Sequence, residues 1–194
     1  MGIYLNPGNL KFKRSVNSEI YVDKTGLIQY TNRVIGTEQC YICMSRPRRF
    51  GKSMTANMLA AYYGRKEDSR ELFSDFAIAR ERSFSKHLNQ YDVLFLNMQE
   101  FLSRSHSVQE MLSQLQASVL WELLDEYKEF RYYDSDSLNR TMEDIFQNTK
   151  IPFVVIIDEW DCIFREYKTD QEAQKQYLDY LRDMLKDKSN IALA

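Results

Sequence analysis

The sequence is poor in the residues that mark disordered, disulfide-bonded or membrane-spanning chains. Its 194 residues include only six glycines, three prolines and three cysteines, whereas 44% are hydrophobic. This composition excludes a fibrous or low-complexity chain, and an odd number of cysteines argues against a disulfide framework. No apolar run approaches the roughly 20 residues that cross a bilayer, and the opening "MGIYLNPGNL" lacks the basic and apolar regions of a secretory signal. We therefore expect a folded cytoplasmic protein without a membrane segment.

The sequence also lacks an excess of positive or negative charge. The chain has 26 basic and 28 acidic side chains, which gives a formal charge of -2. So small a net charge creates no overall field that would draw the protein to nucleic acid or membrane, although a local basic patch is compatible with it. The length suits one domain. We expect a single domain over residues 1–194, with an N-terminal segment over 1–38 and a core over 39–194.

Strands and helices are predicted to alternate along the chain. Apolar runs rich in β-branched and aromatic residues predict buried strands, and apolar residues at helical spacing predict helices. The strands are expected at 39–45, at 91–98 and in the run "FVVIIDEWD", 153–161, and the helices from 24, after 52, after 107, over 137–148 and over 171–186. The final "NIALA" begins like another buried strand. This alternation predicts an α/β fold with a parallel sheet covered on both sides.

The stretch "SRPRRFGKSM", residues 45–54, contains half of a phosphate-binding loop. Gly51, Lys52 and Ser53 match the end of the pattern G-x-x-x-x-G-K-[ST], but Arg46 stands where the first glycine is usual. Between a strand and a helix, such a loop directs backbone N–H groups and the helix N-terminus at an anion. Lys52 would then contact the β- and γ-phosphates, and Ser53 would bind Mg²⁺. Alternatively, Gly-Lys-Ser is a common tripeptide that merely begins a helix.

Arginines at the entrance of this loop allow two interpretations. Arg46, Arg48 and Arg49 are either solvated or ion-paired with acidic residues, or one or two of them bind phosphate oxygens in place of backbone contacts. Pro47 has no N–H and cannot donate to phosphate. The residues that we predict to bind the nucleotide are Arg48, Arg49, Phe50, Gly51, Lys52, Ser53 and Met54.

A second motif, "VVIIDEWD", places carboxylates at the end of the most hydrophobic predicted strand. Ligands of open α/β sheets bind at the carboxyl ends of strands. Asp158 would hold Mg²⁺ together with Ser53, and Glu159 would deprotonate the attacking water as the catalytic base. Alternatively, the carboxylates form a solvated turn. The two motifs together, each after a predicted strand, favour a nucleotide site.

Three stretches resemble the AAA-ATPase-like domain family that is found in many bacterial proteins. They are "IYVDKTGLI" at 20–28, "SRPRRFGKSM" at 45–54 and "VVIIDEWD" at 154–161. The family's loop also reads R-P-R-R-F-G-K-S, so Arg46 is similar to the family, whereas Trp160 stands where tyrosine is more frequent. The resemblance implies a P-loop NTPase three-layer α/β/α sandwich, with a mainly parallel sheet and an extra strand between the two motif strands. It leaves open whether "YVDKT", residues 21–25, approaches the adenine or braces the core.

The resemblance also implies ATP and Mg²⁺ as ligands, and hydrolysis used as a conformational switch. Family members commonly continue past "NIALA" into a sensor strand, a lid and a PD-(D/E)XK nuclease-like domain, so we expect the core over 39–194 to be truncated at its C-terminus. Two alternatives remain open: a nucleotide-binding regulatory or partner-binding module without turnover, and a component of a nucleic-acid-processing protein. Self-association is left open as well. A small-molecule kinase is disfavoured, because Glu159 favours water as the nucleophile.

Overall fold

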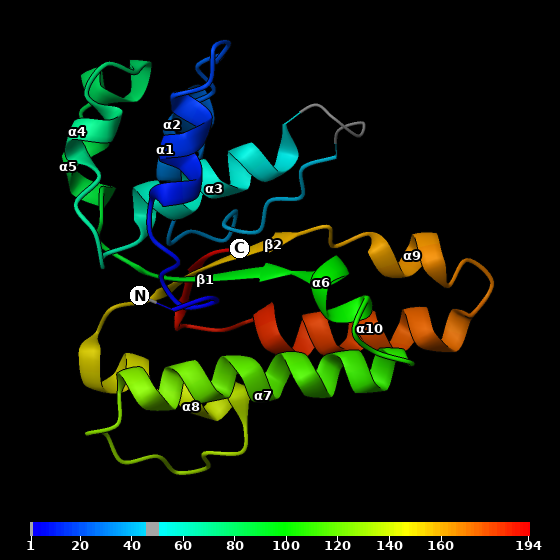
Figure 1. Ribbon diagram of the computed structural model, residues 1–194. Helices are drawn as coiled ribbons and strands as arrows, with labels where there is room; N and C mark the ends of the chain where they lie inside the picture. Colours follow the sequence, from blue (N-terminus) through cyan, green and yellow to red (C-terminus); the bar gives the residue numbers. More distant parts are fainter. Residues whose placement is uncertain (1, 46–50) are drawn as a thin grey trace. The chain divides into compact units, whose positions relative to one another are not determined.

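The computed structural model describes residues 2–45 and 51–194 (Figure 1). Within these ranges the chain is a mixed α/β structure with a small parallel sheet in the order β1-β2-β3. The strands are β1 (Asp92–Asn97), β2 (Phe153–Asp158) and β3 (Ile191–Leu193). The predicted alternation of helices with a parallel sheet is confirmed at this level. Arg46, Arg48, Arg49 and Phe50, which the sequence singled out, lie outside the described residues.

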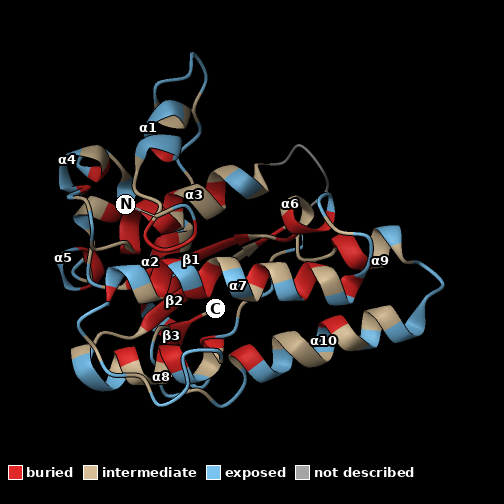
Figure 2. Ribbon diagram, turned by 60° about the horizontal axis from the view of Figure 1, so that its bottom comes forward, coloured by how far each residue is buried: buried red, intermediate tan, exposed pale blue. Residues whose placement is uncertain are grey.

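The strands are short apolar runs, as expected for strands of a parallel sheet that are buried on both faces. In β1 every residue from Asp92 to Leu96 is buried, and β2 is buried from Phe153 to Ile156 (Figure 2). β1 matches its predicted range of 91–98 to within one residue, and β2 lies within the predicted run 153–161. β2 pairs parallel to β3, with Phe153 opposite Ile191. The apolar start of "NIALA" is therefore a strand, as predicted.

The prediction of a strand over 39–45 is wrong, because the structure assigns no strand there. The Ala194 N–H donates to the Cys40 carbonyl at 3.0 Å, and the Ile42 N–H donates to the Ala194 carbonyl at 2.8 Å. These two bonds have the pattern of one parallel pair, and a single pair is too little for a strand. β3 nevertheless lies between β2 and the segment that leads to Gly51, where the resemblance implies an extra strand.

The contacts divide the chain into two compact units. Unit 1 comprises residues 1–95, 151–156 and 191–194, and unit 2 comprises 96–150 and 157–190. The helices of unit 1 are α1 (Leu10–Val16), α2 (Gly26–Val34), α3 (Lys52–Tyr63), α4 (Arg70–Phe73), the 3-10 helix η1 (Ala77–Arg80) and α5 (Phe84–His87). Those of unit 2 are α6 (Met98–Leu102), α7 (Val108–Glu126), α8 (Leu138–Thr149), α9 (Cys162–Glu166) and α10 (Gln171–Leu185).

An aromatic cluster dominates the core of unit 1 and fixes α3. Phe12 of α1 stacks on Phe73 of α4 with ring centroids 5.1 Å apart, and Tyr62 of α3 lies edge-on to Phe73 at 5.5 Å. The buried Tyr62 hydroxyl donates to the Phe84 carbonyl and accepts from Asn32 Nδ2, each at 2.9 Å. Because the hydroxyl both donates and accepts a hydrogen bond, it can be buried without the cost of leaving a polar group unpaired. The helix that begins at Lys52 is thus held firmly at its C-terminal half.

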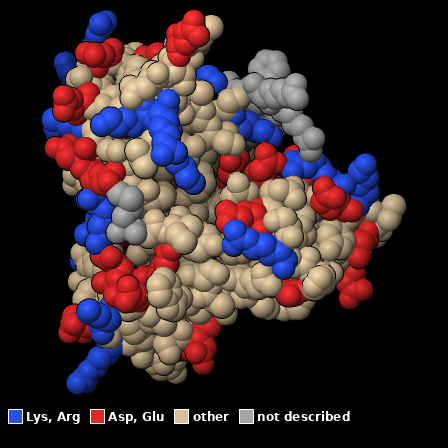
Figure 3. Space-filling model, viewed as in Figure 1, with Lys and Arg blue, Asp and Glu red and all other residues tan. Residues whose placement is uncertain are grey.

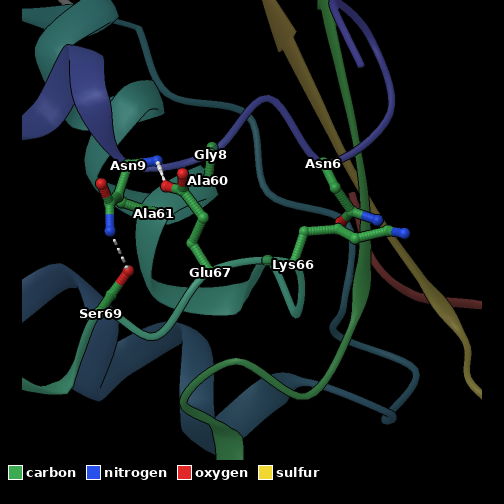
Figure 4. Close-up of a pocket in the computed structure, with 9 residues that line it drawn as sticks. Asn6, Gly8, Asn9, Ala60, Ala61, Lys66, Glu67 and Ser69 are labelled. Carbon is green, nitrogen blue, oxygen red and sulfur yellow. Dashed lines mark hydrogen bonds between the residues drawn. The ribbon is translucent and has the colours of Figure 1, made fainter. Parts of the chain in front are cut away.

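A hydrogen-bonded hollow joins the N-terminal segment to the end of α3 (Figure 4). The Asn9 N–H donates to Glu67 Oε2 at 2.8 Å, and Asn9 Nδ2 donates to Ser69 Oγ at 3.1 Å. The hollow is too narrow to hold a water molecule. It is therefore a joint between chain segments and offers no space to a ligand.

Asp92, at the start of β1, is a fully buried carboxylate. Arg65 Nε and Asn6 Nδ2 donate to its Oδ1 at 2.8 and 2.7 Å. We expect Asp92→Ala to lower the free energy of unfolding by about 3 kcal/mol, because it removes the acceptor from a buried charged pair. The exposed pair of Glu100 with Arg104 provides the control: Glu100→Ala should cost less than about 1 kcal/mol. Urea denaturation measures both losses, and equal losses would contradict this account.

In unit 2, α7, α8 and α10 begin close to their predicted positions, whereas the short helices α6 and α9 were not predicted. Ser107 Oγ accepts the Glu110 N–H at 3.1 Å at the start of α7, and Glu110 Oε2 accepts the His106 N–H at 2.7 Å, so the predicted capping residues act at this helix start. α7 packs against α8 and α10, and buried residues form a stripe along it (Figure 2). The predicted ranges 137–148 and 171–186 match α8 and α10 to within one residue.

Basic and acidic side chains are interspersed over the face that Figure 3 shows, in keeping with the balanced composition. Among the described residues, no helix is both long enough and apolar enough to cross a membrane.

Candidate functional site

The end of the phosphate-loop motif forms the start of α3. Gly51 is the N-cap residue and has a φ of +77°, a conformation that glycine adopts without steric cost. Having no side chain, Gly51 cannot cap the helix, and the first turn contains no acidic residue. The positive end of the helix dipole and the first-turn N–H groups thus favour an anion here. Ser53 is exposed, and Lys52 and Met54 are half-buried.

The YVDKT segment, residues 21–25, braces unit 1 at η1. Asp23 Oδ2 accepts the Ala77 N–H at 3.0 Å, and Thr25 Oγ1 accepts the Ile78 N–H at 3.2 Å. Burial alone would raise the pKa of Asp23, but the N–H groups of Ala77 and Thr25 hold it below its usual range. The Tyr21 ring lies 5.3 Å from that of Phe76. Of the two roles left open for this segment, bracing is the one that these contacts support.

Lys24, within the same segment, extends to the start of α3. A Cβ atom placed on Gly51 would collide with Lys24 Nζ and would lie 3.7 Å from Lys24 Cε. Lys24 is half-buried. Its ammonium group therefore lies directly against the glycine of the phosphate-loop motif.

We expect Gly51→Ala to lower the free energy of unfolding by about 1 to 2 kcal/mol, because a non-glycine residue is strained in the left-handed region. The new Cβ would also displace Lys24 Nζ. Gly26 provides a matched control, since a Cβ there meets nothing within 4 Å, and Gly26→Ala at the start of α2 should be neutral or slightly stabilising. Chemical denaturation compares the two variants. A neutral Gly51→Ala would show that the positive φ is not required.

The second motif ends β2 at a buried carboxylate. Asp158 is 7% exposed, and its Oδ1 accepts the Glu159 N–H at 3.0 Å. Glu159 has a φ of +54°, a left-handed conformation that costs a non-glycine residue on the order of 1 kcal/mol and persists where the surroundings hold it. The chain thus turns sharply at the end of β2. The two residues at this turn are Asp158, the predicted magnesium ligand, and Glu159, the predicted catalytic base.

Arg165 of α9 holds the Glu159 side chain. Its Nη2 donates to Glu159 Oε2 at 2.7 Å and to Gln99 Oε1 of α6 at 3.2 Å, and its Nη1 donates to Asp161 Oδ1 at 2.5 Å. Burial alone would lower the pKa of Arg165, but the hydrogen bond to Glu159 and the charge of Asp161 raise it above its usual value. Glu159 and Asp161 are therefore both ion-paired with Arg165 within unit 2.

The sequence interpretation missed Arg165 and Gln99. Asp161 and Arg165 are four positions apart, the spacing of an i,i+4 ion pair on a helix. Had a helix over 162–166 been predicted from the sequence, this ion pair could therefore have been predicted as well. Gln99 lies 66 positions from Arg165 in the chain and carried no comparable signal. The pairing of the acidic residues with Arg46, Arg48 or Arg49 falls outside the described residues.

Magnesium suits the predicted ligands by their chemistry. Mg²⁺ at phosphate sites takes one or two protein oxygens and completes its shell with phosphate and water, and Ser53 and Asp158 each carry a side-chain oxygen of that kind. In the described parts of the chain, no group of three or more His, Cys, Asp or Glu side chains could hold a metal by itself.

A wider groove, of about 650 Å³, lies between α7 and α10 in unit 2. Trp121, which is 70% exposed, and Asp136 are among its lining residues. Its described lining contains no lysine or arginine, so the groove offers phosphate no cation. It is a poor alternative location for a nucleotide.

Comparison with known proteins identifies the family. A family model described as predicted AAA-ATPase matches residues 10–192. The comparisons with curated proteins and with solved structures found no match. The matched range contains the YVDKT segment, the start of α3 and the acidic end of β2. The chain therefore belongs to the predicted AAA-ATPase family.

Proposed function

We propose that this chain binds MgATP and hydrolyses its β–γ bond, and that hydrolysis serves as a conformational switch. The observation that carries the proposal is the start of α3, where Gly51 at positive φ leads into Lys52 and Ser53 with the helix N-terminus behind them. Membership of a predicted ATPase family supports the same conclusion.

In this proposal each predicted residue has a role. Lys52 contacts the β- and γ-phosphates, and Arg48, Arg49, Phe50, Gly51, Ser53 and Met54 are the other residues proposed to bind the nucleotide. Ser53 and Asp158 hold Mg²⁺, which neutralises phosphate charge when bound. Glu159 takes a proton from water as the water oxygen bonds to the γ-phosphorus, and the bond from that phosphorus to the β–γ bridging oxygen breaks. The products are ADP and inorganic phosphate.

The order of the strands supports the proposal that these residues bind one nucleotide. The segment 40–42 and β2 run parallel, with β3 between them, and parallel strands present their carboxyl ends at one edge of a sheet. Gly51 follows the first of these segments, and Asp158 ends β2. We propose accordingly that the full arrangement is the three-layer α/β/α sandwich of a P-loop NTPase.

A second candidate function is nucleotide binding without turnover. The observation that favours it is the ion pair between Arg165 and Glu159, which occupies an oxygen of the proposed base. The paired carboxylate has to reach the water to act as a base.

Two measurements on the wild-type chain separate these functions. Calorimetric titration with MgATP measures binding, and a coupled assay measures phosphate release. Saturable binding with phosphate release supports the ATPase. Saturable binding without release supports the module without turnover, and the absence of binding would overturn both.

A further inference from the structure

We infer that Lys24 is a second phosphate-binding lysine, acting beside Lys52 on the phosphate chain of the nucleotide. The inference rests on the proposed function. It assigns a role to the lysine of the YVDKT segment, whose other polar residues bond to η1.

The position of Lys24 is determined by its neighbours on both sides. Asp23 and Thr25 are bonded to the backbone of η1 at Ala77 and Ile78, and Thr25 is fully buried. A residue between two anchored positions has little freedom to move along the surface. From this fixed backbone position the Lys24 side chain extends to Gly51, and its Nζ occupies the space that a Cβ would need.

The electrostatics of this position favour an anion. The helix dipole is positive at the N-terminus of a helix. Two lysines, Lys24 and Lys52, lie at the start of α3, and its first turn contains no acidic residue. The dipole and both ammonium groups would attract the same bound polyphosphate.

The number of cations also suggests the class of ligand. A chain of phosphates carries more negative charge than a single phosphate, so a second ammonium group adds more to its binding. Lys24 should therefore add more to the binding of a nucleoside triphosphate than to the binding of a monophosphate.

The test compares Lys24→Met with Lys24→Arg. Lys24→Met keeps an unbranched side chain and removes the charge, and Lys24→Arg retains the charge. Lys86→Met is the matched control, because Lys86 is an exposed lysine of α5 in the same unit, and α5 lies away from the start of α3 (Figures 1 and 2). Titration calorimetry with MgATP and with AMP measures affinity, after melting without nucleotide has shown that each variant folds.

We expect Lys24→Met to weaken MgATP binding at least about 10-fold, the loss typical of one charged hydrogen bond. AMP binding should weaken less, Lys24→Arg should retain most of the affinity, and Lys86→Met should match the wild type. Wild-type affinity in Lys24→Met, or equal losses for MgATP and AMP, would overturn the inference and leave Lys24 as part of the brace. Absence of MgATP binding by the wild type would instead overturn the proposed function itself.

A measurement on the wild-type protein covers the case in which Lys24→Met does not fold. Lysine acetylation, followed by mass spectrometry, reports the accessibility of each ammonium group. MgATP should protect both Lys24 and Lys52 and leave Lys86 unchanged. Protection of Lys52 without protection of Lys24 would overturn the inference while supporting the proposed function.

Discussion

Lys52→Ala is expected to abolish the thermal stabilisation that MgATP gives to the wild-type protein. Lys52 is the first residue of α3, and in the proposed function its charge contacts the β- and γ-phosphates. At a ligand concentration of about 100 times Kd, binding adds about 2.7 kcal/mol to the free energy of unfolding. For a chain of this length that corresponds to an increase in Tm of roughly 5 to 10 °C. The variant should show an increase near zero under the same conditions.

Lys86→Ala is the control for Lys52→Ala, because it removes one exposed lysine of the same unit. Its response to MgATP should equal that of the wild type. Both variants should melt near the wild-type temperature without nucleotide, since neither lysine is buried. A full MgATP response in Lys52→Ala would show that the start of α3 is not the phosphate site.

Glu159→Gln should reduce phosphate release at least about 100-fold, the contribution of a general base, while MgATP binding persists. The amide has nearly the same shape as the carboxylate and its oxygen can still accept from Arg165 Nη2, which donates to Glu159 Oε2 at 2.7 Å. It cannot accept the proton of the attacking water. Single-turnover phosphate release, with binding measured separately, distinguishes these two effects.

The control for Glu159→Gln is Glu166→Gln, which makes the same chemical change at an exposed residue of α9. Phosphate release from this variant should equal that of the wild type. If Glu159→Gln abolished binding, the Glu159 carboxylate would have a structural role through Arg165. If it left release unchanged, another group would be the base.

Local features were the most predictable from the sequence. The capping residue Ser107, the buried strand before Asp158 and the helix after Gly51 each follow from neighbouring residues. Patterns of this kind depend on propensity and burial over a few positions, so one sequence suffices to recognise them. The positive φ of Gly51 likewise agrees with the glycine that the motif requires.

Features that depend on distant partners were not predictable. Residues 39–45 have the composition of a strand. In the described residues, however, their only backbone pairing with a neighbouring strand is with Ala194. A strand requires a series of such backbone hydrogen bonds, and the composition alone does not supply them. Asp92 looked like an ordinary polar start of a strand, and its bond to Asn6, 86 positions earlier, explains its burial. The contact of Lys24 with Gly51 depends in the same way on the anchoring of its neighbours to η1.

Backbone amide shifts on titration with MgATP test the central claim most directly. The account predicts saturable ¹⁵N and ¹H shifts at Gly51, Lys52 and Ser53, because N–H groups at the start of α3 would bind phosphate. The indole signal of Trp121, in the groove between α7 and α10, should stay unchanged. Saturable shifts at Trp121 with no change at Gly51, Lys52 and Ser53 would contradict the account.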